Sequence, residues 1–324
     1  MTDIKHDIGA LYAFDVYSDG HTEIYSGGQL PRLGDSVAYR WVHLDLEHEG
    51  AFNWIKAQTD ETVAEALTMD DTRPRHTRHE NASLLNLRGV NLNPASDPED
   101  MVSIRLWANE RMIISVRRRK LMAVVAMREA IEAGHAPKSV GEFLTQLSEG
   151  MTERMTPVID GLVDELDALE EQSLEQSTGL RSQLAELRRT VIALRRYIGP
   201  QREALSRLAA DGGNLIGEDE KSDLRENVDR ITRLMEEMDA IRERCGVMND
   251  QLADARAEEM NRNMMVLSVV AAIFLPLGFL TGLLGVNVGG IPGADNAYAF
   301  LLLCIFMVLL GGGITLLFKK LKWL

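Results

Sequence analysis

The sequence has almost no cysteine, since Cys245 and Cys304 are the only two in 324 residues. Two such distant cysteines do not form a disulfide framework. The sequence also lacks a Gly-x-Ser-x-Gly elbow, a Walker-type phosphate loop and a Cys-His nucleophile arrangement. We therefore expect neither an enzyme nor a resident cofactor.

Charge is missing from one long stretch near the C-terminus. No Asp, Glu, Lys or Arg occurs between Asn263 and Ala294, and after Asp295 the next charge is Lys319. Within this stretch, residues 264–284 and 297–318 are apolar runs. At about 1.5 Å per residue, each run reaches roughly the 30 Å of a bilayer core. The sequence predicts two transmembrane helices joined by an external loop over 285–296.

The distribution of charge also predicts the topology. The opening MTDIKHDIGALYAFDVYSDG has no basic start followed by an apolar core, so it is not a signal peptide. Three lysines follow the second span and none lies in the loop, which places both termini in the cytoplasm. The net charge of −14 argues against a nucleic-acid partner and favours attraction of cations.

Three regions differ in their periodicity. Residues 1–138 alternate strand-like and short helical patterns, which predicts an α/β domain with a mixed sheet. The segments that we expect to form strands are IGALYAFDV, YRWVHLDLEH, SLLNLRGVNLN, MVSIRLWAN and RMIISVRRR. Residues 139–262 are helical, with a second helix that we expect to be interrupted near Pro200. The last helix starts near Glu218 and continues into the transmembrane domain, 263–324, as one rod of about 100 Å.

Residues spaced by three and four mark one face of this last helix. The face runs Gly285, Gly282, Gly278, Leu275, Ala271, Ser268, Met264, Asn261, Ala257, Asp254 and Asp250, with Leu267 beside Ser268. We call it the stripe.

The stripe has two interpretations. Gly278-x-x-x-Gly282 is typical of close packing between transmembrane helices. That packing gives no reason for carboxylates at Asp250 and Asp254 on the same line, whereas a path for cations does. Because two helices cannot enclose water, such a path needs several copies of the chain. Apolar rings on the stripe would then gate the path by dewetting.

Two positions near the outer end of the first span add to this hypothesis. Pro276 lacks an N–H and leaves the carbonyl of Ala272 without its helical donor, so it is a candidate hinge or a static bend. Asn287 would form a ring of amides in a symmetric oligomer, and amide oxygens bind the water shell of a divalent ion. The alternative for Asn287 is a simple turn.

Gly285-Val286-Asn287, placed between two terminal spans, and the ending KKLKWL resemble the CorA superfamily of divalent metal transporters. The resemblance implies a homopentameric funnel with a pore-lining first span and a peripheral second span. It implies an outer selectivity filter at Gly285, Val286 and Asn287 and a cytosolic acidic ring at Asp250. The pore-lining positions that it implies are Asn261, Met264, Leu267, Ala271, Leu275 and Gly278.

The sequence departs from the magnesium-channel pattern at Val286, where those channels have methionine, and at Gly293, where they usually have an acidic residue. GVNVGGIPG, DTRPRHTRHENASLLNLRGVNLN and SDPEDMVSIR resemble the ZntB branch instead. That branch implies zinc uptake, coupled to protons, across the bacterial inner membrane, with cobalt, nickel, cadmium or magnesium as other cargo. A magnesium or cobalt channel of the same architecture is the first alternative, and a membrane-anchored coiled-coil scaffold that conducts nothing is the second.

Other acidic and histidine clusters are weaker candidates. His76-x-x-His79-Glu80 has the spacing of metal ligands but lies among arginines, which oppose cation binding. Acidic runs within 160–175 and 218–223 are typical of solvated helix faces, with ion sensing as the alternative.

Overall fold

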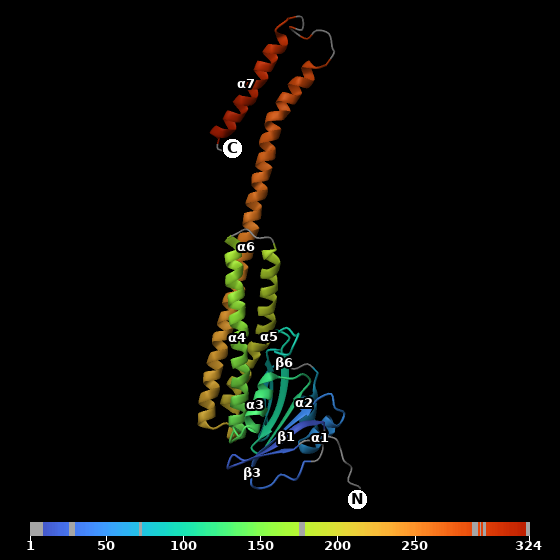
Figure 1. Ribbon diagram of the computed structural model, residues 1–324, viewed down its shortest axis with the longest axis vertical. Coiled ribbons are helices and arrows are strands. Elements are labelled where there is room, and N and C mark those ends of the chain that lie inside the picture. The colour runs from blue at the N-terminus through green and yellow to red at the C-terminus, as the bar shows by residue number, and fades with distance from the viewer. Residues whose placement is uncertain are drawn as a thin grey trace. The chain divides into compact units, whose positions relative to one another are not determined.

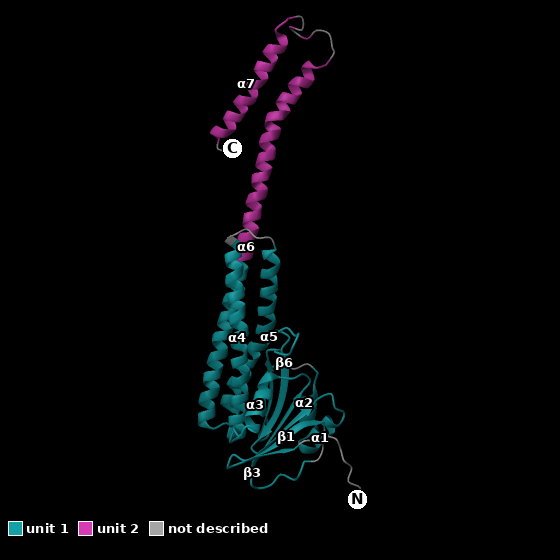
Figure 2. Cartoon of the chain, in the orientation of Figure 1, with its two compact units in different colours: residues 1–247 teal, residues 248–324 magenta. Residues whose placement is uncertain are grey.

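The computed structural model describes residues 9–25, 30–70, 73–174, 179–286, 291, 293 and 296–321. The chain divides into two compact units, residues 1–247 and 248–324 (Figure 2). The predicted boundaries at 138 and 262 follow changes of sequence pattern rather than compactness, and they stay predictions.

The first unit contains one seven-stranded sheet with the order β2-β1-β3-β7-β6-β5-β4. Its strands are Ala10–Tyr17, Thr22–Tyr25, Val37–Asp45, Arg75–His79, Ala82–Gly89, Val102–Asn109 and Met112–Arg117, numbered β1 to β7. Only the β3–β7 pair is parallel, with Trp41 opposite Ile113, and all other neighbours are antiparallel. The mixed sheet that the sequence predicted is confirmed, whereas the short strands β2 and β4 were missed.

Alternation along β3 gives the sheet two covered faces. Val42 and Leu44 point to a core shared with α1 (Gly50–Gln58) and α2 (Glu61–Thr68), where Ile55 and Leu67 are buried. Trp41 points the other way and meets Phe143 of α4 (Val140–Leu174) with ring centroids 4.9 Å apart. Helix α3 (Met122–Glu132) packs against α4, and helix α5 (Leu180–Asp211) packs against β4 and β5 (Figure 1).

Three long helices continue from the sheet: α4 (Val140–Leu174), α5 (Leu180–Asp211) and α6 (Glu218–Leu284). They lie side by side in the first unit (Figure 1), and ion pairs link them. Helix α5 buries Leu180, Leu184, Leu187, Val191, Leu194 and Ile198 at alternating steps of four and three, which is a coiled-coil repeat. The interruption predicted at Pro200 is wrong, because α5 continues through it. One missing N–H is tolerated in a helix packed along its length.

The second unit holds the rest of α6 and helix α7 (Ala299–Lys320). The short 3-10 turn η1 (Gly213–Leu215) belongs to the first unit and precedes α6. Both α6 and α7 contain windows apolar and long enough to cross a membrane. Only 6% of the α6 window and none of the α7 window is buried within the chain, so neither is the core helix of a soluble fold. Their apolar surface needs lipid or other copies of the chain.

Candidate functional site

The stripe predicted from the sequence lies on α6, and we call it the α6 stripe from here on. It is exposed along its whole described length in the second unit. The side chains of Met264, Leu267 and Leu275 are 55%, 70% and 71% exposed. A Cβ added at Gly278 or Gly282 would meet no atom within 4 Å. No side chain of the described part of the chain therefore covers this face.

Helix α7 covers a different face of α6. Val269 is 5% exposed, and its neighbours Ala272, Ile273, Pro276, Leu277 and Leu280 are half-buried. Leu277 Cδ1 lies 3.6 Å from the position that a Cβ would take at Gly311 of α7. Because successive helix residues turn by about 100°, this covered face points away from Met264, Ala271 and Leu275. The second span thus leaves the α6 stripe free.

The stripe is apolar in the membrane segment and polar before it. Asp250, Asp254 and Asn261 are all exposed on α6. In the apolar segment, Ser268 Oγ donates to the carbonyl of Met264 at 2.8 Å and Thr281 Oγ1 donates to that of Leu277 at 3.0 Å. These hydroxyls are satisfied within their own helix, so the helix needs no polar partner there.

Helix α6 continues through Pro276 and ends at Leu284. Gly285 donates its N–H to the carbonyl of Thr281 at 2.9 Å. A Cβ at Gly285 would lie 2.9 Å from that same oxygen, closer than a carbon atom tolerates, so this turn requires glycine. Val286 follows and is 50% exposed, whereas Asn287, the proposed selectivity residue, lies outside the described residues.

The histidine cluster does not converge. His76 is buried and its Nε2 lies 3.1 Å from Ser83 Oγ, whereas His79 Nε2 lies 2.7 Å from Asp60 Oδ2. Three residues apart on β4, the two rings point to opposite faces of the sheet. Over the described residues, no group of three or more His, Cys, Asp or Glu side chains is arranged to hold a metal ion.

The acidic helix runs have partners that the sequence did not identify. Arg244 of α6 donates to Asp167 and Glu170 of α4, each at 2.6 Å. Arg195 of α5 pairs with Asp239 of α6 through two hydrogen bonds of 2.6 Å, which hold the pKa of Asp239 below its usual range. Such pairs depend on helix rotation in three dimensions, and spacing along one helix does not reveal them.

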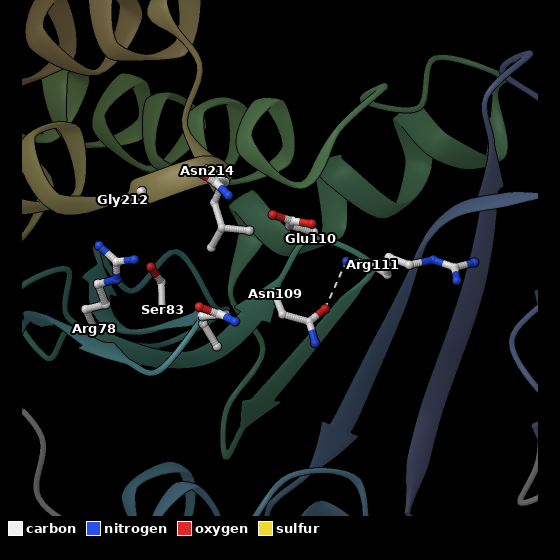
Figure 3. Close-up of a pocket in the computed structure, with 11 residues that line it drawn as sticks. Arg78, Ser83, Asn109, Glu110, Arg111, Gly212 and Asn214 are labelled. Carbon is white, nitrogen blue, oxygen red and sulfur yellow. Dashed lines mark hydrogen bonds between the residues drawn. The ribbon is translucent and has the colours of Figure 1, made fainter. Parts of the chain in front are cut away.

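A polar cavity of about 330 Å³ lies in the first unit, where two strand hairpins meet the connection between α5 and α6 (Figure 3). Arg78, Ser83, Asn109 and Glu110 line it together with Gly212 and Asn214. The guanidinium of Arg111 is turned away and donates to the carbonyl of Gly34. The lining mixes both signs of charge and defines no ligand class.

The fold and the exposed spans define a membrane protein with a large N-terminal α/β and helical unit and two helices near the C-terminus. A family model described as "CorA-like Mg2+ transporter protein" matches residues 36–320. The chain belongs to this family of transporters.

Individual relatives agree over nearly the full length. The chain is 36% identical over 324 residues to "Zinc transport protein ZntB" of Pectobacterium carotovorum, covering 99% of this chain and 98% of that one. It is 41% identical over 292 residues to "Divalent cation transporter CmaX" of Pseudomonas aeruginosa, covering 88% and 87%. The resemblance that the motifs indicated is confirmed.

Solved structures share the fold. The full-length CmaX structure superposes with a TM-score of 0.85 at 36% identity and covers 99% of this chain. The CorA magnesium transporter of Methanocaldococcus jannaschii superposes with a TM-score of 0.81 over 97% of this chain. At 16% identity, the second match concerns the fold alone.

Proposed function

We propose that the chain transports divalent cations across the bacterial cytoplasmic membrane as a homopentamer, with both termini in the cytoplasm and zinc as the cargo. The observation that carries the proposal is the α6 stripe, which stays exposed on the face that α7 leaves free. Copies of α6 arranged around an axis would bury this stripe and enclose a path.

Each part of the path has a proposed role. Asp250 and Asp254 concentrate cations at the cytosolic end, Asp250 contacts the ion, and Asn261 continues the polar lining. Met264, Leu267, Ala271 and Leu275 form an apolar constriction, and Gly278 presents backbone beside it. At the outer mouth, Gly285 and Val286 position Asn287, whose amide binds the hydrated ion. An ion that keeps its water shell needs no charged ligand within the membrane.

The choice of zinc as the transported ion is supported by the ZntB relatives, which are 33–36% identical to this chain. The family description names magnesium, so a magnesium or cobalt channel of the same architecture is the second candidate. Coupling to protons is part of the proposal. No Asp, Glu, His, Lys or Arg lies between Met264 and Leu284 or between Ala299 and Phe318. The proton would therefore move through water or as hydroxide with the ion.

The test is ion influx into proteoliposomes that contain a zinc-sensitive dye, with and without an inward proton gradient. Asn287→Ala should abolish zinc influx, and the gradient should raise the wild-type rate. Magnesium influx in place of zinc would favour the second candidate. No flux of either ion would leave a membrane-anchored coiled-coil scaffold that conducts nothing, for which Asn287 and the α6 stripe are dispensable.

A matched pair of variants tests the stripe itself. Leu275 and Phe274 are adjacent on α6 and similarly exposed, at 71% and 67%, but only Leu275 lies on the stripe. Leu275→Ala should change the flux several-fold because it widens the constriction, whereas Phe274→Ala should leave it within about two-fold. Equal effects of the two substitutions would contradict the proposed path.

A further inference from the structure

The outer face of α4 is strongly acidic. From Val140 to Leu174 the helix carries nine acidic residues and one basic residue. Five exposed carboxylates fall on one line of the helix, at Glu153, Asp160, Asp164, Asp167 and Glu171. Among the described residues, only Asp167 of these five forms an ion pair, with Arg244. Most of this negative line is therefore unneutralised within the chain.

Small residues lie directly beside this acidic line. Pro157, Gly161 and Ala168 are exposed on the adjoining strip of α4. A Cβ added at Gly161 would meet no atom within 4 Å. Since the distance between packed helices depends on the side chains at their contact, this strip allows another helix to approach closely.

The outer face of α5 has the opposite charge. From Leu180 to Asp211 the helix has seven arginines and three acidic residues. Four exposed arginines form no ion pair with any described residue: Arg181, Arg188, Arg189 and Arg196.

An exposed apolar side chain lies among these arginines. Ile192 is 49% exposed. Arg188, Arg189 and Arg196 are four residues before it, three before it and four after it, so they surround it on the helix surface. A single aliphatic side chain within a ring of charge is suited to act as an anchor in a protein interface.

We infer that the outer face of α4 binds the outer face of α5 on a second copy of the chain. The acidic line would meet the arginines, and Ile192 would pack against the strip at Gly161. Because the two faces differ, the contact is heterologous and repeats from copy to copy around a ring. Charge pairs at such a surface mainly set register and association rate, while the apolar anchor excludes water. The inference rests on the homo-oligomer of the proposed function.

The first experiment maps the contact directly in the full-length protein in detergent. A photoreactive benzoylphenylalanine replaces Ile192 in an unlabelled chain. This chain is mixed with unmodified chain that was expressed separately in ¹⁵N medium, and the mixture is dissociated and reassembled in detergent. Irradiation should join peptide 188–196 of the unlabelled copy to a ¹⁵N peptide from 153–171. Cross-links confined to one chain, to other elements or to lipid would overturn the inference.

The second experiment reverses the charges. Arg189→Glu with Arg196→Glu should remove most of the intermolecular cross-link, as should Asp160→Arg with Asp164→Arg. All four substitutions together should restore it, since both faces then carry reversed charge. The matched control is Arg128→Glu with Glu132→Arg, which reverses an exposed ion pair within another helix, α3, and should change nothing.

Oligomer mass separates this inference from the proposed function. A ring of the expected mass without the cross-link overturns the α4–α5 contact and leaves the transporter proposal standing. A monomer in every detergent and lipid tested overturns both.

Discussion

Leu277 of α6 faces Gly311 of α7, and Leu277 Cδ1 lies 3.6 Å from the place that a Cβ would take on Gly311. The two spans approach each other here, on the face away from the α6 stripe. Alanine would fit at Gly311 with ordinary contacts, whereas a large side chain would push α7 away. We expect Gly311→Ala to preserve flux and Gly311→Phe to lower both flux and the melting temperature of the purified protein. Equal behaviour of the two variants would contradict the packing described.

A second prediction concerns the end of α6. Gly285→Ala should lower zinc flux at least ten-fold, because its Cβ would collide with the carbonyl oxygen of Thr281 and displace the residues that follow. Gly313→Ala in α7 is the control, since a Cβ there meets nothing within 4 Å. The measurement is zinc influx through both variants in proteoliposomes with equal protein content. Normal flux through Gly285→Ala would show that the turn tolerates a side chain.

The cytosolic acidic residues should act through long-range attraction. Asp250→Asn with Asp254→Asn is expected to reduce flux several-fold at low ionic strength. The reduction should shrink in about 0.5 M salt, where charges are screened within a few ångströms. Glu259→Gln removes an exposed carboxylate from another face of α6 and is the control. Salt-independent loss in the double variant would contradict long-range attraction and leave the contact of Asp250 with the ion as the sole cause.

The ion pair between Asp15 and Arg40 is almost fully buried, with side chains 3% and 4% exposed. Removing one partner leaves an uncompensated buried charge, so Asp15→Ala should destabilise the first unit by about 3–5 kcal/mol. Replacing both, as Asp15→Leu with Arg40→Met, should cost far less. Urea unfolding followed by tryptophan fluorescence would measure the free energy of unfolding of both variants. Similar losses in the single and double variants would contradict the argument.

His43 makes stability depend on pH. Burial and then the charge of Arg117 lower the pKa of His43 to about 3. In the unfolded chain His43 has the ordinary histidine pKa near 6.5. Between about pH 3 and 6.5, His43 is therefore protonated in the unfolded chain but neutral in the folded chain. Stability should therefore be complete above about pH 6.5 and fall by up to about 1.4 kcal/mol per pH unit below it.

The variant His43→Gln tests this dependence, because glutamine does not titrate. Its unfolding free energy, measured in urea between pH 7 and 4, should fall less steeply than that of the wild type. Parallel curves would mean that other groups cause the acid sensitivity.

Much of the fold followed from pattern alone. Alternating segments located β1, β3, β5, β6 and β7, because buried strands with apolar faces leave a clear period of two. The strands β2 and β4 lie at the edges of the sheet, where exposed residues such as Ile24 and Arg75 blur that alternation. The period of two arises because one face of a strand is buried, and edge strands are buried too little to show it clearly.

The candidate site was accessible from sequence for a related reason. A stripe that repeats every three or four residues needs only one helix, so Met264, Ala271 and Leu275 could be aligned without a structure. Which face α7 covers was not predictable, because Val269 and Leu277 are as apolar as the residues on the stripe. The pairing of Arg195 with Asp239 likewise depends on packing between helices distant in sequence.

The single parallel pair in the sheet, β3 with β7, has a consequence for biogenesis. Strands β1 to β3 and β4 to β7 each pair as antiparallel neighbours, which close early because their loops are short. The two halves join only after β7 has been synthesised, at residue 117 of 324. Both spans come far later in translation. The sheet therefore has time to form on the ribosome before any hydrophobic segment reaches the membrane.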